Sequence, residues 1–185
     1  LLCTIFGNSD SLAFALIRDP MLVYWLAEEQ VLSTAPTREG MEAAVRQSLG
    51  SLKTTELKLD VLRRVRRREM LRIGVRDLLR LATVWETTDS LSDLASVLIH
   101  AAYEIVDRDL KALYGTPMHQ TKEGTWVETQ FSVIGMGKLG GHELNYSSDV
   151  DLIYIYSSAD GETRRTLAGK SDEDRTLSNE EYFEL

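Results

Sequence analysis

The stretch FSVIGMGKLGGHELNYSSDVDLIYIY, residues 131–156, contains the patterns that decide the fold. β-branched and aromatic residues are concentrated at 126–134 and again at 149–156, which predicts two strands joined by a glycine-bearing connection over 135–148. In the second strand Asp149 and Asp151 alternate with Val150. Strand periodicity predicts that both carboxylates leave one face while Val150 points to the core.

Three kinds of phosphate-binding site compete for this stretch. The run from Gly135 to Gly140 fits the dinucleotide pattern G-x-G-x-x-G, with Asp160 about twenty residues further on. That site needs a helix crossing to a parallel strand, but only about ten residues, several of them poor helix formers, precede Asp149. A P-loop is excluded because Leu139, not Ser or Thr, follows Lys138.

The third candidate is a metal-dependent nucleotidyltransfer site. Asp149 and Asp151 would supply the oxygen ligands that a hard divalent ion bridging phosphates requires. The pair Gly140-Gly141 would let backbone approach a phosphate chain, and one of the serines at 147–148 would donate to a phosphate oxygen. A D-x-D pattern alone is common at strand ends, but its combination with a preceding Gly-Gly and a serine-bearing turn is much more specific.

The preceding two-thirds of the chain predicts helices, so the fold class is α+β. Apolar periodicity and capping residues predict helices at 10–18, from Pro20 onward, at 37–49, at 56–84 and at 90–114. We expect Gly115 to end the last of these, followed by a loop at 116–125 that contains His119. Residues 157–177 predict a long mobile loop, and 178–181 predict a capping box.

Charge is spread unevenly along the chain. The net charge is -8, yet residues 51–80 contain ten basic and four acidic residues. This basic segment is interpreted mainly as a solvated helix, with a role in docking or in internal scaffolding left open. Nucleic acid is not expected as a partner, because no aromatic residue interleaves with these arginines for base stacking.

Composition narrows the class of protein further. The chain has 185 residues, of which 43% are hydrophobic and 27% charged, so a buried core is feasible. Its one cysteine, Cys3, excludes an intramolecular disulfide framework, and no apolar run approaches the ~20 residues of a membrane span. We therefore expect a soluble cytoplasmic protein with no membrane partner. Because the chain begins at Leu1 and its last helix has barely begun, we expect a piece of a longer protein.

The segment GMGKLGGHELNYSSDVDLIYIY, residues 135–156, resembles the nucleotidyltransferase superfamily. It resembles more closely the family of bifunctional glutamine synthetase adenylyltransferase/adenylyl-removing enzymes. The resemblance extends to LRRVRRREMLRIGVRDLL at 62–79, to SNEEYF at 178–183 and, more loosely, to 6–20. It implies a helical region over 1–115, followed over 116–185 by the truncated start of a nucleotidyltransferase catalytic domain with an antiparallel or mixed sheet.

The resemblance also implies site residues. Asp149 and Asp151 match the family's catalytic, metal-binding aspartates, with Mg²⁺ or Mn²⁺ as the cofactor. Gly140, Gly141 and Ser148 match nucleotide-contacting positions. Lys138 falls within the family's G-K-L-G-G sequence, where it either contacts phosphate or stabilises the turn.

The family implies a reaction and its partners. Met136, the run 145–148 and the 178–183 segment are similar to the half that removes AMP from a tyrosine of glutamine synthetase by phosphorolysis, yielding ADP. The partners implied are glutamine synthetase, ATP or ADP, phosphate and a PII-type signalling protein. The family's third acidic residue lies on a later strand that this chain does not reach, hence the hypothesis that the chain alone is inactive.

Three alternatives remain open at this point. The chain could belong to the AMP-attaching half of the same enzyme, it could be a dinucleotide-binding oxidoreductase, or it could be a non-catalytic helical interaction module.

Overall fold

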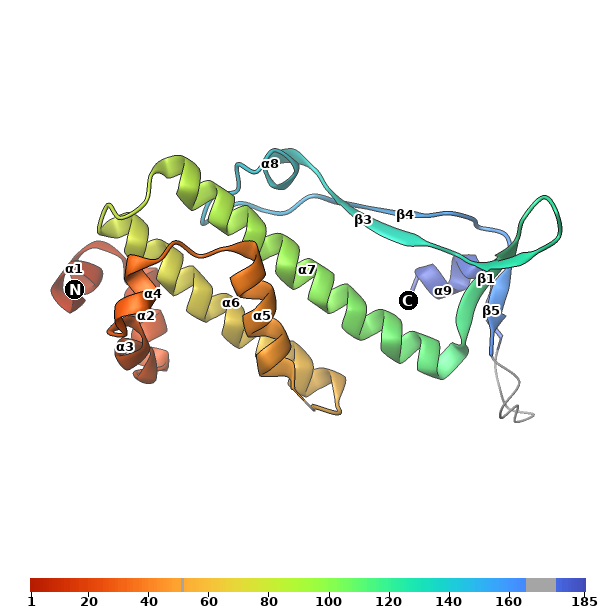
Figure 1. The fold of residues 1–185 in the computed structure, drawn as a ribbon, viewed down its shortest axis with the longest axis horizontal. Helices are drawn as coiled ribbons and strands as arrows, with labels where there is room; N and C mark the ends of the chain where they lie inside the picture. Colours follow the sequence, from red (N-terminus) through yellow and green to blue (C-terminus); the bar gives the residue numbers. More distant parts are fainter. Residues whose placement is uncertain (51, 166–175) are drawn as a thin grey trace. The chain divides into compact units, whose positions relative to one another are not determined.

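A computed structural model describes residues 1–50, 52–165 and 176–185 (Figure 1). The chain packs into two compact units, one formed by residues 1–102 with 137–150 and the other by 103–136 with 151–185. Helix α7 (Val84–Tyr114) contributes to both units. Helices give way to strands at β1 (Thr116–Gln120), which confirms the α+β class. That a catalytic domain begins at residue 116 stays a prediction.

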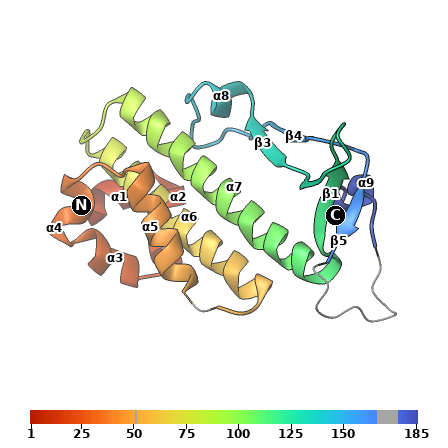
Figure 2. The ribbon, with the colours of Figure 1, turned by 45° about the vertical axis from the view of Figure 1, so that its right-hand side comes forward.

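The first unit is helical, with α5 packed along α6 (Figures 1 and 2). Its shorter helices are α1 (Leu2–Asn8), α2 (Asp10–Arg18), α3 (Met21–Leu26) and α4 (Glu29–Ser33). The longer ones are α5 (Arg38–Leu49) and α6 (Thr55–Leu78). Apolar side chains from α1–α4 close over one face of α6 to form a buried core, which comprises Ile5, Leu16, Leu26, Val31, Leu71 and Val75.

Several predicted helix ends are confirmed. The side chain of Ser9 accepts a hydrogen bond from the backbone of Leu12 and caps α2, and Thr37 caps α5 by accepting one from Gly40. Gly50 follows α5 with a positive φ of 44°. These ends are local features, which explains why capping residues in the sequence located them.

The boundary between α6 and α7 differs from the prediction. Helix α6 ends at Leu78 rather than near 84, because Arg80 takes the left-handed conformation (φ 57°) and the backbone N–H of Leu81 donates to Arg76, 2.8 Å away. This is a Schellman ending built without glycine. Thr83 and Glu86 then cap each other reciprocally, so α7 begins at Val84 instead of Ser90.

Part of the arginine-rich segment is internal scaffolding. Arg72 and Arg76 donate to backbone carbonyls at the end of α4, with Arg72 reaching Val31 at 2.8 Å and Thr34 at 2.9 Å. Glu69 is almost fully buried and pairs with Arg68. The guanidinium groups donate hydrogen bonds to these carbonyls, and these bonds fix α4 against α6.

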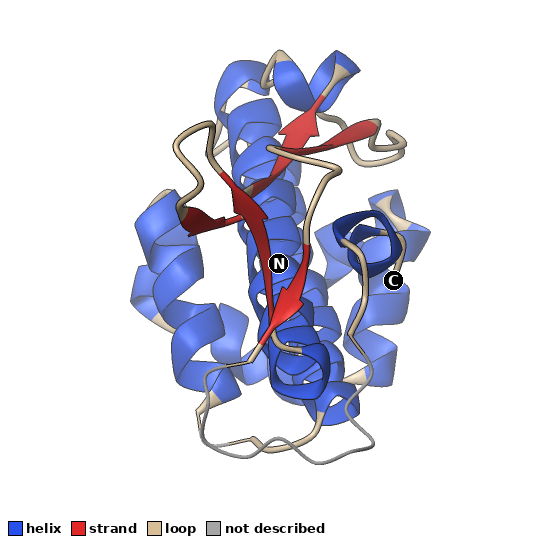
Figure 3. Ribbon diagram, turned by 90° about the vertical axis from the view of Figure 1, so that its right-hand side faces the viewer, coloured by secondary structure: helices blue, strands red, loops and turns tan. Residues whose placement is uncertain are grey.

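The second unit contains two small antiparallel sheets (Figure 3, strands in red). One has the order β2-β1-β5, with β2 (Trp126–Glu128) and β5 (Glu162–Arg164) flanking β1. The other pairs β3 (Phe131–Gly135) with β4 (Leu152–Tyr156).

These strands correct two predictions. Residues 116–125 are not entirely a loop, because β1 occupies their first half. The single strand predicted at 126–134 is two strands, interrupted where buried Thr129 donates its backbone N–H to Pro117 and Gln130 turns to pair with Ser157. The interruption arises because β2 and β3 belong to different sheets.

Helix α9 (Asn179–Phe183) packs on this unit through an aromatic cluster. The ring of Phe183 stacks on Phe131 and Tyr156, with centroids 5.3 and 4.7 Å apart. The predicted capping box is present, with Ser178 and Glu181 as its members. The helix start is therefore encoded locally and its position is fixed by packing.

The mobile loop predicted at 157–177 contains the strand β5, and its residues 166–175 lie outside the described part. Across the residues that the structure describes, no helix is both long and apolar enough to cross a membrane.

Candidate functional site

The glycine-bearing connection folds as one short helix with a defined ending. Helix α8 (Gly137–Gly140) is followed by His142 in the left-handed conformation, with φ 56°. The backbone N–H of Glu143 donates to Lys138 at 2.8 Å, and that of His142 donates to Leu139 at 3.2 Å. These two bonds form a Schellman motif, in which His142 reverses the chain after α8.

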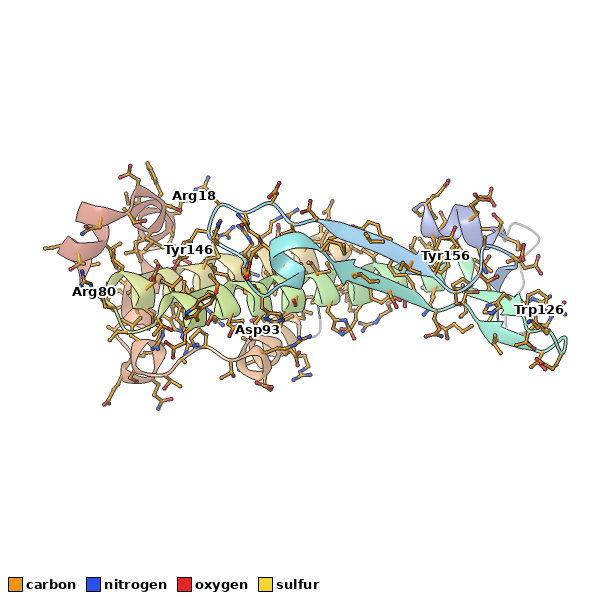
Figure 4. The ribbon with its side chains drawn as sticks, turned by 90° about the horizontal axis from the view of Figure 1, so that it is seen from above. Arg18, Arg80, Asp93, Trp126, Tyr146 and Tyr156 are labelled. Carbon is orange, nitrogen blue, oxygen red and sulfur yellow. The ribbon has the colours of Figure 1, made fainter. Side chains whose placement is uncertain are left out.

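The turn after α8 is anchored to the helices of the first unit. Leu144 is buried and its backbone N–H donates to the hydroxyl of Ser92 on α7 at 3.2 Å. The hydroxyl of Tyr146, which is labelled in Figure 4, donates to the Asp77 carboxylate on α6 at 3.0 Å. Partial burial, together with the neighbouring Asp77 charge, raises the pKa of Tyr146. These two contacts hold the turn immediately before the aspartates.

The hydroxyl of Ser148 is engaged inside that turn. It donates to the side-chain oxygen of Asn145 at 2.9 Å and accepts from the Asn145 backbone N–H at 3.3 Å. The same Asn145 oxygen accepts the backbone N–H of Ser147. The observed function of Ser148 is therefore to close an Asx turn, and its contact with nucleotide stays a prediction.

Asp149 and Asp151 are exposed at the entry to β4. Neither carboxylate makes a hydrogen bond or ion pair within the described chain. The strand begins later than predicted, at Leu152, which pairs with Gly135, the last residue of β3. The last hydrogen bond of the ladder runs from the backbone N–H of Met136 to the backbone carbonyl of Asp151. Val150 is 39% exposed, so the prediction that it points to the core is wrong.

These two carboxylates fit part of a divalent-metal site. Carboxylate oxygens are the ligands that Mg²⁺ and Mn²⁺ prefer, and Mg²⁺ is commonly bound by one or two carboxylates together with substrate phosphates and water. Over residues 1–50, 52–165 and 176–185, no cluster of three or more His, Cys, Asp or Glu residues is arranged to hold a metal. Binding of a metal by Asp149 and Asp151 together therefore stays a prediction.

The remaining predicted contacts lie on α8 and just after it. Lys138 is exposed and makes no ion pair with the described residues. Gly140 ends α8. A Cβ built on Gly141 would come no closer than 3.6 Å to a neighbouring atom, so the fold has room for a larger residue there. The fold does not require glycine at this position, and the close approach of a ligand to the backbone would explain why glycine is present.

The dinucleotide-binding hypothesis is wrong for this segment. Strands β3 and β4 pair antiparallel, and the helix between them has four residues. A Rossmann unit needs a full crossover helix between parallel strands, so its glycines cannot present a pyrophosphate to a helix N-terminus here.

The family described as "Glutamate-ammonia ligase adenylyltransferase" matches residues 1–180. Among curated proteins the chain is 35% identical to the bifunctional glutamine synthetase adenylyltransferase/adenylyl-removing enzyme of Shewanella oneidensis over 180 residues, which are 97% of this chain and 17% of that protein. It is 37% identical to the protein of the same name from Nitrosococcus oceani, over 98% of this chain and 18% of that protein. The chain thus spans less than a fifth of the length of these relatives.

Proposed function

Because the chain belongs to the glutamate-ammonia ligase adenylyltransferase family, we propose that it forms part of an enzyme that removes AMP from an adenylylated tyrosine of glutamine synthetase. The acceptor is inorganic phosphate and the product is ADP. The observation that most supports this proposal is the pair of exposed, unpartnered carboxylates, Asp149 and Asp151, directly after a turn that contacts with α7 and α6 hold in place. We place the reaction in the cytoplasm.

In this reaction an oxygen of phosphate forms a bond to the α-phosphorus while the bond from that phosphorus to the tyrosyl oxygen breaks. The tyrosine leaves as a phenolate and takes a proton from solvent. Asp149 and Asp151 would hold Mg²⁺ or Mn²⁺, which when bound neutralises charge on the phosphoryl oxygens. Gly140 and Gly141 would give backbone access to the nucleotide, and Ser148 would keep Asp149 in position through the Asx turn.

Lys138 extends from α8 with no partner in the described chain, so its ammonium group is available to a phosphate oxygen. No covalent nucleophile is required in this scheme. A PII-type protein is proposed as a regulator from the resemblance alone.

The test is Asp151→Asn in the full-length enzyme, assayed for phosphate-dependent ADP release from adenylylated glutamine synthetase. We expect a loss of more than about 100-fold, because one charged ligand to the metal is removed. Asp160→Asn is the matched control, since Asp160 is an exposed carboxylate beyond β4 and the acidic residue that the dinucleotide hypothesis would require. It should retain full activity.

AMP incorporation from ATP is measured on the same two variants. Loss of incorporation with normal ADP release would assign the segment to the AMP-attaching half. Normal rates in both directions for Asp151→Asn would refute a catalytic role for this motif.

A further inference from the structure

A cavity of about 920 Å³ lies within the first unit, between α2 and α6. Tyr146 and Ser147, from the turn that precedes Asp149, form part of its wall, and α2 contributes Arg18. Arg18 and Tyr146 are labelled in Figure 4. A cavity of this volume is large enough for several side chains or a drug-sized ligand. It is not used by the proposed chemistry.

The charged groups of this cavity favour an anionic occupant. Arg18, Arg66 and Arg67 line it, and none of the three makes a hydrogen bond or ion pair with another described residue. This distinguishes them from Arg72 and Arg76, which are bound to carbonyls of α4. Asp77 also lines the cavity, but its carboxylate already accepts the hydroxyl of Tyr146.

The apolar groups favour a protein segment over a free nucleotide. Leu71 and Met70 line the cavity, and Phe14, 64% exposed, lies on its α2 wall. The same helix and the next one expose further large apolar side chains, namely Ile17, Met21 and Tyr24. Aromatic, methionine and arginine side chains are enriched in the centres of protein interfaces. A nucleotide in the cavity would leave these other apolar side chains of α2 and α3 uncovered.

We propose that this cavity docks an acidic segment of glutamine synthetase, with an apolar side chain entering between α2 and α6. Carboxylates of the segment pair with Arg18, Arg66 and Arg67. This inference deepens the proposed function and rests on it for the identity of the partner. Because Ser147 lines the cavity two residues before Asp149, docking here places the protein substrate on the turn that leads to the aspartates.

The test is the affinity of the full-length enzyme for adenylylated glutamine synthetase, measured by surface plasmon resonance at fixed salt. Arg67→Glu and Phe14→Ser are each expected to raise the Kd at least about tenfold. Arg64→Glu is the matched control, since Arg64 is an exposed arginine on the same helix that does not line the cavity. It should change the Kd by less than about twofold. Thermal melts by circular dichroism verify that each variant is folded, and Phe14 is exposed enough for its replacement to be tolerated.

Each outcome has a definite meaning. Equal weakening by Arg67→Glu and Arg64→Glu would indicate diffuse charge attraction and overturn the docking site. An unchanged Kd for Phe14→Ser would also overturn the docking site. So would an Arg67→Glu variant that binds ADP or phosphate more weakly but binds glutamine synthetase normally. The Asp151→Asn assay tests the proposed function independently. If the cavity variants bind glutamine synthetase more weakly but Asp151→Asn keeps full turnover, the proposed chemistry is refuted and the docking site is still supported.

Discussion

At the scale of single residues, the sequence singled out Asp149 and Asp151, whose carboxylates are exposed in the structure, but residue type gave no sign that the backbone reverses at His142. Glycine adopts positive φ without strain, whereas other residues seldom do. The structure has it at Gly137 and at His142. A non-glycine residue in this conformation is held there by the Schellman hydrogen bonds, which depend on where α8 begins and cannot be read from residue type alone.

Gly141 therefore provides a direct test of ligand approach. Gly141→Ala should leave the free energy of unfolding within about 0.5 kcal/mol of the wild type, because the new methyl group meets only ordinary contacts at 3.6 Å and beyond. If backbone at this position lies against the nucleotide, the same methyl group should raise the Kd for ADP roughly tenfold. Isothermal titration calorimetry measures this affinity.

Gly7→Ala is the control for Gly141→Ala, since a Cβ at Gly7 meets no atom within 4 Å and α1 is remote in sequence from the motif. It should leave ADP binding unchanged. Identical ADP affinity in Gly141→Ala and the wild type would mean that the nucleotide does not approach this backbone.

At the scale of elements, local signals located most helix ends, apart from the boundary between α6 and α7, and did not locate the short strands. Thr37, Gly50 and the Ser178–Glu181 box marked helix ends through contacts within one turn. The sequence also contains the Thr83–Glu86 capping box, a local signal that marks the start of α7. The three residues of β2 and of β5 are defined by pairing with β1, and such pairing has no local signature.

Asn179 joins several of these elements. Its side chain is fully buried, and its amide nitrogen donates to the carbonyl of Asp160 at 2.7 Å and to the hydroxyl of Thr129 at 2.8 Å. Asn179→Ala should lower the free energy of unfolding by about 2–3 kcal/mol, because it leaves buried acceptors without a donor. Urea denaturation monitored by circular dichroism measures the loss.

Gln130→Ala removes an exposed amide from the same unit and should change the stability by less than about 0.5 kcal/mol. Equal urea midpoints for the Asn179 and Gln130 variants would show that the buried amide does not hold α9 to the residues around Thr129 and Asp160.

At the scale of the whole molecule, the three tyrosines and the lysine with raised pKa values all make the folded state less stable at alkaline pH. Burial raises the pKa of Tyr103, Tyr146 and Tyr182, and nearby carboxylates act in the same sense. Burial alone would lower the pKa of Lys111, but hydrogen bonds to Asp107 and Glu128 outweigh it and raise that pKa. Near pH 10 the unfolded chain begins to lose protons that the folded chain keeps, so the folded state loses stability as pH rises further.

Tyr182 offers the clearest test of this alkaline loss. Its side chain is 2% exposed and its hydroxyl has no hydrogen-bond partner within the described chain. Tyr182→Phe should leave the free energy of unfolding at pH 7 unchanged or raise it by up to about 1 kcal/mol, because a buried hydroxyl without a partner is removed. Since the group that resists ionisation is also gone, the decline of stability between pH 9 and pH 12 should be shallower than in the wild type.

Urea midpoints measured across this range test both effects. The control is Tyr24→Phe, which removes an exposed phenol and should follow the wild-type curve. A Tyr182→Phe curve that falls as steeply as the wild type above pH 10 would mean that the buried phenol does not contribute to the alkaline loss, which would then depend on Lys111 and the two other tyrosines.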